Sequence, residues 1–207
     1  MNNEARGSSD DMTDPARLRG FVDGRRIIVG VTGGIAAYKT ATVVSRLAQA
    51  GAEVTVLMTE SATKFVTALT FQALSGRAVY TSAWEHIESK DPQHIALASG
   101  ADLAIVAPAS MDCLAKLATG RADDVVSLVL SAIDRAKTRV LLAPAMNAAM
   151  WAQPSTRRNV KTLIDDGFVM VGPAEGWQAC RTNGDGRMSE PADLLGAIAR
   201  EMHNSVR

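Results

Sequence analysis

Short apolar runs alternate with longer segments of helical periodicity from residue 26 onward, and this alternation limits what the chain can fold into. The runs expected as strands are 26–31, 53–58, 103–108, 139–144 and 168–171. Each run is apolar along most of its length, which is typical of strands buried on both faces in a parallel sheet. The sequence therefore predicts an α/β fold, a single doubly wound domain whose mostly parallel sheet is flanked by helices.

Helical periodicity fills the intervals between these runs. The expected helices are 35–50, 61–75, 110–119, 124–131, 155–166 and 192–203. Gly51 stands where a glycine commonly ends a helix.

Two segments break the alternation of strands and helices. Residues 80–93 are polar and predict a surface excursion, and residues 172–191 are too long and too rich in Gly, Asn, Asp and Arg for a simple connection. The second segment is either a functional flap or disordered.

Composition excludes several classes of protein. The 207 residues carry 22 Lys+Arg and 22 Asp+Glu, so no net field attracts nucleic acid or an anionic membrane. No apolar run is long enough to span a bilayer. Residues 1–24 are polar, lack the apolar stretch of a signal peptide, and predict a flexible arm before a domain at 25–207. Two cysteines, Cys113 and Cys180, suggest reduced thiols and a cytoplasmic location.

The first expected strand runs into a glycine-rich turn. Gly33 and Gly34 let the backbone approach a phosphate at a helix start, but neither Gly-x-Gly-x-x-Gly nor Gly-Lys-Ser/Thr occurs here. Thr59 and Ser61, after the second strand, add hydroxyls that suit the phosphate of a mononucleotide. Taken alone, such a turn serves packing about as often as phosphate binding.

The fourth expected strand ends at Pro144, and an amide follows where the next helix should begin. Asn147 can donate two N–H groups to a carboxylate and return its C=O to a backbone donor. A helix start also favours an anion. The alternative is an ordinary turn in which Met146, Met150 and Trp151 belong to the core.

Two further side chains are candidates for proton transfer. His94 lies before the third expected strand, and a neutral imidazole can accept a proton near neutral pH. A lone histidine on such a helix is more often a surface or core residue. Cys180 stands among glycines and polar residues, which predicts an accessible thiol, whereas Cys113 is expected to serve packing.

Four separated motifs, in this order, resemble those of the flavin-dependent cysteine decarboxylase (HFCD) family. They are Gly-Val-Thr-Gly-Gly-Ile-Ala-Ala-Tyr-Lys, His-Ile-Ala-Leu followed by Ala-Pro-Ala-Ser-Met-Asp, Pro-Ala-Met-Asn-Ala-Ala-Met-Trp, and Ala-Cys followed by Gly-Arg-Met-Ser-Glu-Pro. The last is most similar to the substrate clamp of phosphopantothenoylcysteine decarboxylases. The resemblance implies a flavodoxin-like or Rossmann-like flavoprotein that binds FMN. The implied FMN-binding residues are Gly33, Gly34, Ile35, Thr59, Ser61, Phe65, Ser110 and Met111.

The resemblance also implies the chemistry. The substrate's cysteine moiety would be oxidised to a thioaldehyde, lose CO2 as an enethiol, and be reduced again. His94 would act as base, Asn147 would hold the carboxylate and Cys180 would supply a proton. Implied substrate contacts are Met146, Met150, Ala179 and Asn183. The implied reaction converts 4'-phosphopantothenoylcysteine to 4'-phosphopantetheine in coenzyme A biosynthesis, with no metal.

Two departures from the family pattern and several alternatives stay open. Met111-Asp112 replaces a common Ala-Asn, and Arg181-Thr182 replaces a common Gly-Asp. The resemblance implies a homo-oligomer, a trimer or dodecamer, in which His94 can act on a neighbour's flavin. The other possible functions are an oxidative peptidyl-cysteine decarboxylase, a flavin prenyltransferase and a non-catalytic flavoprotein regulatory subunit.

Overall fold

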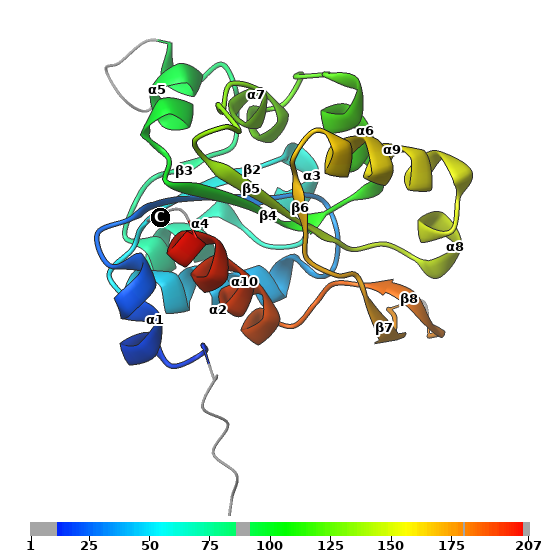
Figure 1. The fold of residues 1–207 in the computed structure, drawn as a ribbon, viewed down its shortest axis with the longest axis horizontal. Helices are drawn as coiled ribbons and strands as arrows, with labels where there is room; N and C mark the ends of the chain where they lie inside the picture. The colour runs from blue at the N-terminus through cyan, green and yellow to red at the C-terminus, as the bar shows by residue number, and fades with distance from the viewer. Residues whose placement is uncertain (1–11, 86–91, 180, 205–207) are drawn as a thin grey trace, which may run out of the picture.

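The computed structural model describes residues 12–85, 92–179 and 181–204. Within this part, six parallel strands form one sheet in the order β3-β2-β1-β4-β5-β6. The strands are β1 (Arg26–Val31), β2 (Glu53–Met58), β3 (Val79–Tyr80), β4 (Leu103–Ala109), β5 (Arg139–Pro144) and β6 (Val169–Met170). This arrangement confirms the predicted doubly wound parallel sheet (Figure 1).

Helices connect the strands and cover both faces of the sheet. They are α1 (Pro15–Val22), α2 (Ala37–Gln49), α3 (Glu60–Thr63), α4 (Ala68–Ser75), α5 (Gln93–Gly100), α6 (Met111–Thr119), α7 (Val125–Ser131), α8 (Ala148–Trp151), α9 (Pro154–Asp165) and α10 (Pro191–Asn204). In Figure 1, α1, α2, α4 and α10 lie on one side of the sheet, and α5, α6, α7 and α9 lie on the other. The sheet is therefore the middle of three layers.

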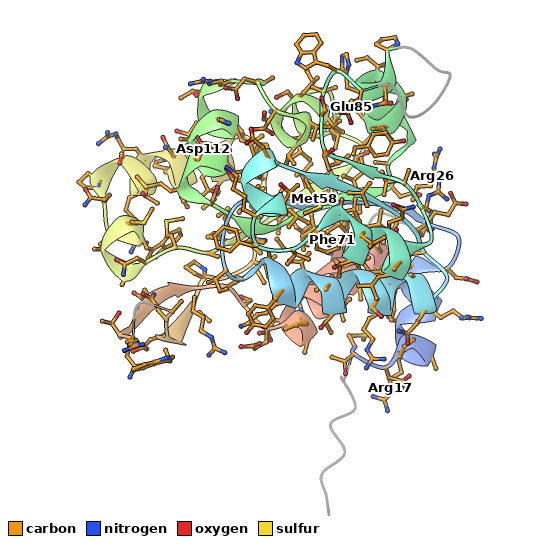
Figure 2. All side chains as sticks on the ribbon, turned by 180° about the vertical axis from the view of Figure 1, so that it is seen from behind. Arg17, Arg26, Met58, Phe71, Glu85 and Asp112 are labelled. Atoms are coloured by element: carbon orange, nitrogen blue, oxygen red, sulfur yellow. The ribbon has the colours of Figure 1, made fainter. Side chains whose placement is uncertain are left out.

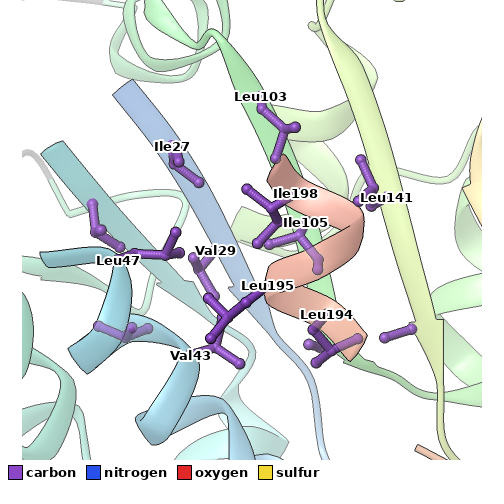
Figure 3. Packing of buried hydrophobic residues seen from close by; sticks show 14 of the residues in the cluster. Ile27, Val29, Val43, Leu47, Leu103, Ile105, Leu141, Leu194, Leu195 and Ile198 are labelled. Carbon is purple, nitrogen blue, oxygen red and sulfur yellow. The ribbon is translucent and has the colours of Figure 1, made fainter. Parts of the chain in front are cut away.

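Alternate side chains of the strands supply the two cores. Ile27 and Val29 of β1 face α2 and α10, where Leu195 of α10 packs among them (Figure 3). Ile28 faces the opposite way, into the cluster that contains Leu114 of α6. Phe71 is the largest fully buried side chain, and Figure 2 shows it between the sheet and the helices of its layer. Burying a side chain of this size contributes about 1.5–3 kcal/mol.

The order of the strands reverses between β1 and β4, which places a switch point at the middle of the sheet. The chain leaves β1 toward α2 on one face and leaves β4 toward α6 on the other. In sheets of this kind, ligands bind in the crevice outside the carboxyl ends of the strands at such a point. The carboxyl edge between β1 and β4 is therefore where a functional site is expected.

The N-terminal part differs from the expectation of a flexible arm over residues 1–24. Pro15–Val22 forms α1, whose N-cap Asp14 accepts a hydrogen bond from the N–H of Ala16. Leu18 and Val22 are fully buried in the core shared with α2 and α10. The segment is polar on average, but these two residues lie one helical turn apart on a single face, which is enough to dock a short helix.

The segment expected as either flap or disorder, residues 172–191, is an antiparallel hairpin in its described part. β7 (Ala174–Trp177) pairs with β8 (Asn183–Arg187). In Figure 1 the hairpin extends from the carboxyl side of the sheet below α8. The alternative of disorder is thus wrong for the residues that the structure describes.

One expected helix is two. The segment 61–75, expected to be helical, holds most of α3 and all of α4. Residues 64–67 separate the two helices, and Thr67 has extended backbone angles. Adjacent β-branched residues, Val66 and Thr67, favour this break because they lose side-chain freedom in a helix.

Candidate functional site

Thr32, directly after β1, joins the two loops of the switch point. Its side chain is 1% exposed. The Oγ1 donates a hydrogen bond to the carbonyl of Pro108 at 2.6 Å and accepts one from the N–H of Ser110 at 2.9 Å. The loop after β1 and the loop after β4 are therefore held in one fixed relation. No periodic pattern marks Thr32. In the sequence it is marked by its hydroxyl beside two glycines and by its place in the first of the four motifs.

The glycines that follow have different steric surroundings. A Cβ at Gly33 would lie 2.5 Å from the Cβ of Ser61, so this position must be glycine. A Cβ at Gly34 would meet only Pro108 Cγ, at 3.8 Å, so the loop leaves open space there. Within the described residues, the backbone N–H groups of Gly33, Gly34 and Ile35 have no hydrogen-bond acceptor. Successive N–H groups before a helix form a site for an anion.

Three predicted residues follow β2, beside this loop. Thr59 caps α3, since its Oγ1 accepts from the N–H of Ala62 at 3.2 Å. Ser61 packs against Gly33. The register places Val31 of β1 opposite Met58 of β2, so the two loops start side by side. Phe65 is 50% exposed, so its ring is not part of the buried core.

Ser110 and Met111 begin α6. The Oγ of Ser110 accepts a hydrogen bond from the N–H of Cys113 at 3.2 Å and so caps the helix, and Met111 is half-buried. The Nζ of Lys116, one turn further along, lies 2.9–3.1 Å from carboxylate oxygens of Asp112, Asp123 and Asp124. Burial lowers the pKa of Lys116, but the hydrogen bonds to these three carboxylates outweigh it and raise the pKa. This charged cluster ties α6 to the start of α7.

Asn147 is the N-cap of α8, at the end of the loop after β5. Its Oδ1 accepts a hydrogen bond from the N–H of Ala149 at 2.8 Å. The strand register pairs Ala109 with Pro144, so this loop starts beside the one that carries Ser110. Asn147 therefore lies on the same edge of the sheet as the glycine loop. The expectation that its C=O would bond a backbone donor is confirmed.

The alternative that Met146, Met150 and Trp151 belong to the core holds only in part. Trp151 is buried, with the guanidinium of Arg157 stacked 4.6 Å from the centre of its ring. Met146 is half-buried against the core, whereas Met150 is 43% exposed. Trp151 therefore anchors the segment 144–151 in the core, whereas Met150 stays accessible.

The hairpin is attached to this motif by backbone contacts. The N–H of Met146 donates to the carbonyl of Gly186 at 2.9 Å. A Cβ at Gly186 would lie 2.4 Å from the Met146 carbonyl oxygen, and its φ is +115°, so only glycine fits. Ala179 and Asn183, predicted to contact substrate, are both exposed on the hairpin. The predicted Cys180 lies outside the described residues.

An ionic contact holds the base of the hairpin. Glu190 accepts a hydrogen bond from Lys39 Nζ at 2.9 Å and also pairs with Arg187 of β8. Lys39 belongs to α2, which follows the glycine loop. The hydrogen bond from Lys39 lowers the pKa of Glu190. No local pattern predicts this link, because Lys39 and Glu190 are separated by 151 positions.

Within one chain, His94 does not lie next to Asn147 at the carboxyl edge of the sheet. It is half-buried near the start of α5, which packs mainly against α7. Figure 1 shows α5 and α8 at opposite ends of the molecule. The other histidine of this region, His86, lies outside the described residues.

A cavity of about 420 Å³ also lies away from the candidate site. It is lined by Arg25, Arg26 and Asp102, among others, at the amino edge of the sheet. Figure 2 shows Arg26, which lines this cavity, and Asp112 toward opposite sides of the molecule. Asp112 belongs to α6, the helix that Ser110 caps, so the cavity is remote from the candidate site.

Among the described residues, none of the helices combines the length and the apolar character that a membrane span requires.

Comparison with known proteins agrees with this geometry. The model of the Flavoprotein family matches residues 17–203. The Bacillus subtilis coenzyme A biosynthesis bifunctional protein CoaBC is 44% identical over 175 residues, 84% of this chain and 42% of that protein. The chain thus spans less than half the length of this relative.

Solved structures share the fold across almost their whole length. A mutant PPC decarboxylase complexed with pantothenoylaminoethenethiol is 28% identical, with a TM-score of 0.76 over 87% of this chain and 99% of that one. The FMN-dependent cysteine decarboxylase SpaF is 28% identical, with a TM-score of 0.75 over 88% of this chain and 98% of that one. The chain therefore belongs to the Flavoprotein family, and cysteine decarboxylases are among its structural neighbours.

Proposed function

We propose that this chain binds FMN and decarboxylates 4'-phosphopantothenoylcysteine to 4'-phosphopantetheine, a step of coenzyme A biosynthesis. The observation that carries the proposal is the position of Asn147. Its amide is fixed at the carboxyl edge of the sheet, next to loops whose N–H groups suit an anion. The names of the bacterial relative and of the PPC decarboxylase neighbour support the same substrate.

The residues at the switch point fit FMN. The N–H groups of Gly33, Gly34 and Ile35 would hold its phosphate, and the open space beside Gly34 lets the group approach the backbone. The remaining FMN contacts would come from Thr59, Ser61, Phe65, Ser110 and Met111. When bound, FMN supplies reversible two-electron redox chemistry next to the substrate's thiol-bearing carbon.

The chain's own residues would orient the substrate and move protons. Asn147 would donate to the substrate carboxylate and hold the C–C bond that breaks in a fixed position. The rest of the substrate would contact Met146, Met150, Ala179 and Asn183. The net reaction replaces a C–COO⁻ bond with a C–H bond, releases CO2 and takes up one proton, which Cys180 would provide.

His94 would act as base from a neighbouring chain. The separation of α5 from α8 supports this, because one chain does not bring His94 to Asn147. Exposed apolar side chains support an assembly, namely Ile35, Tyr38, Phe65 and Leu69, which are 50–70% exposed and lie near the carboxyl edge. We infer a trimer, or a dodecamer built from trimers, that works in the cytoplasm.

Two measurements test the proposal. The purified protein should be yellow, release FMN on heating, and form CO2 from phosphopantothenoylcysteine. The mass of the product separates the possible functions. Phosphopantetheine supports the proposal, whereas an enethiol lighter by two hydrogens would indicate an oxidative cysteine decarboxylase. A yellow protein that produces neither compound would instead favour a regulatory subunit.

A further inference from the structure

Gln178 directly follows β7, and its side chain bonds backbone groups of both β8 and α8. It is 7% exposed. Its Oε1 accepts a hydrogen bond from the N–H of Ala148 at 3.1 Å. Its Nε2 donates to the carbonyl of Asp185 at 2.8 Å and lies 3.4 Å from the carbonyl of Gly184. One buried amide thus spans both strands of the hairpin and the start of α8.

The backbone of Gln178 also closes the turn of the hairpin. Its N–H donates to the carbonyl of Thr182 at 2.8 Å, and its carbonyl accepts from the N–H of Arg181 at 2.9 Å. The main chain of this residue therefore holds the turn, while its side chain holds β8 and the start of α8. The turn cannot move relative to α8 without breaking bonds to Gln178.

The bond to Ala148 acts directly on Asn147. Ala148 is the first residue of α8 and Asn147 is its N-cap, so the acceptor on Gln178 fixes the peptide group between them. The preceding residue, Met146, is held by Gly186 of the same hairpin. Gln178 and Gly186 thus fix the backbone on both sides of Asn147, and with it the position from which the Asn147 side chain extends.

Only an amide of this length satisfies both partners. Glutamate could accept from Ala148 but has no proton for the carbonyl of Asp185. Methionine would match the length but leave the N–H and the carbonyls without partners. Leaving a buried polar group unsatisfied costs about 1–3 kcal/mol.

We propose that Gln178 is a positioning residue, which fixes the Asn147 amide relative to the hairpin so that the substrate carboxylate is held for decarboxylation. This role rests on the proposed function. Gln178 acts through Ala148 and Asn147 and need not touch the reacting atoms. A displacement of about 1 Å at a reacting group can cost about 100-fold in rate.

The test compares Gln178→Glu and Gln178→Met with the wild-type holoenzyme. Gln153→Glu is the matched control, because Gln153 is exposed after α8 and makes no side-chain cap. We expect kcat/KM for phosphopantothenoylcysteine to fall about 10–100-fold in both Gln178 variants, with unchanged FMN content. The control should stay within about 2-fold of wild type. Unchanged kcat/KM in both Gln178 variants would overturn the proposal.

A second measurement separates positioning from a general structural role. Substrate affinity is measured from the flavin absorbance change in Gln178→Glu, Asn147→Ala and the double variant. If Gln178 acts through Asn147, the double variant should bind no more than about 2-fold more weakly than Asn147→Ala alone. Fully additive losses would contradict the proposal.

Amide hydrogen exchange tests the contact without turnover. The N–H of Ala148 should exchange at least about 10-fold faster in Gln178→Met than in wild type, while amides of β1 stay protected. Equal exchange at Ala148 would overturn the inference. If wild type forms no CO2 but Ala148 exchanges faster in the variant, the proposed function fails while the contact with Asn147's helix stands.

Discussion

The Oδ1 of Asn147 accepts a hydrogen bond from the backbone N–H of Ala149, 2.8 Å away. Because an N–H group must face an oxygen, this bond fixes which end of the amide is Oδ1 and which is Nδ2. The donor end is thereby oriented by the first turn of α8. An aspartate could make the same bond to Ala149 but could donate none, and this difference can be tested.

Asn147→Asp should preserve the fold and abolish the reaction. Aspartate is as good an N-cap as asparagine, so the melting temperature should stay within about 3 °C of wild type. The new carboxylate would repel the substrate's carboxylate, and kcat/KM should fall at least about 100-fold. Steady-state CO2 release with FMN-loaded protein measures this. Activity within about 3-fold of wild type would exclude Asn147 from carboxylate binding.

Thr32→Val should loosen the switch point. Valine matches threonine in shape but removes the hydroxyl that bonds both Pro108 and Ser110. Two buried backbone groups would lose their partner, so the free energy of unfolding should fall by about 2–4 kcal/mol. Denaturant unfolding measures this loss. Thr63→Val serves as a comparison, because its hydroxyl bonds only the carbonyl of Glu60 at the surface, and it should change stability by less than about 1 kcal/mol.

Gly186→Ala should detach the hairpin. The new Cβ would meet the carbonyl oxygen of Met146 at 2.4 Å, in addition to the strain of a positive φ. Gly76→Ala controls for the strain alone, since Gly76 has a φ of +68° and open space around it. We expect Gly76→Ala to cost about 1–2 kcal/mol and Gly186→Ala to cost more. Limited proteolysis should then cut within 174–187 in the Gly186 variant only. Equal resistance of both variants would show that the contact with Met146 is not needed.

The pairing of Glu190 with Lys39 should make hairpin docking sensitive to acid. The pKa of Glu190 is lowered in the folded protein, first by the hydrogen bond from Lys39. Its stabilising contribution is therefore present above the unfolded value near 4.5 and is lost as the pH falls through the lower folded pKa. The side chain is 46% exposed, so the effect should stay below about 1 kcal/mol. Unfolding experiments below about pH 5 should show a shallower pH dependence for Glu190→Gln than for wild type. Identical slopes would contradict this prediction.

Cys113 should resist alkylation in the folded protein. It is buried beside Leu114 and Leu117, and burial, followed by the nearby carboxylates of Asp124 and Asp112, raises the pKa of its thiol. The reactive thiolate is therefore scarce. In a Cys180→Ser background, iodoacetamide should label the native protein at about pH 8 at least about 100-fold more slowly than the unfolded protein. Comparable rates would mean that α6 opens readily.

The expected strands 26–31, 53–58 and 139–144 have the same bounds as β1, β2 and β5. This agreement has a simple reason, since strands buried on both faces are continuous apolar runs that end where polar residues begin. The cap at Ser110 and the bond from Asn147's C=O to a backbone donor could be predicted likewise, because helix starts depend on residues only two or three positions apart.

Other features were decided only by the tertiary structure. α1 was missed because its two buried residues stand in a polar segment and are buried only through contact with α2 and α10. The separation of α5 from α8 depends on how the layers stack (Figure 1), which no local pattern encodes.

By itself the sequence determined the layered class of fold, the long strands β1, β2, β4 and β5 with the helices that follow them, and the residue types gathered at the ends of the strands. The tertiary structure decided which of these residues meet. Thr32 bonds Ser110 across 78 positions, and Gln178 bonds Ala148 across 30. Hydrogen bonds of this kind form between single polar groups, whose partners are chosen by packing and leave no periodic trace along the chain.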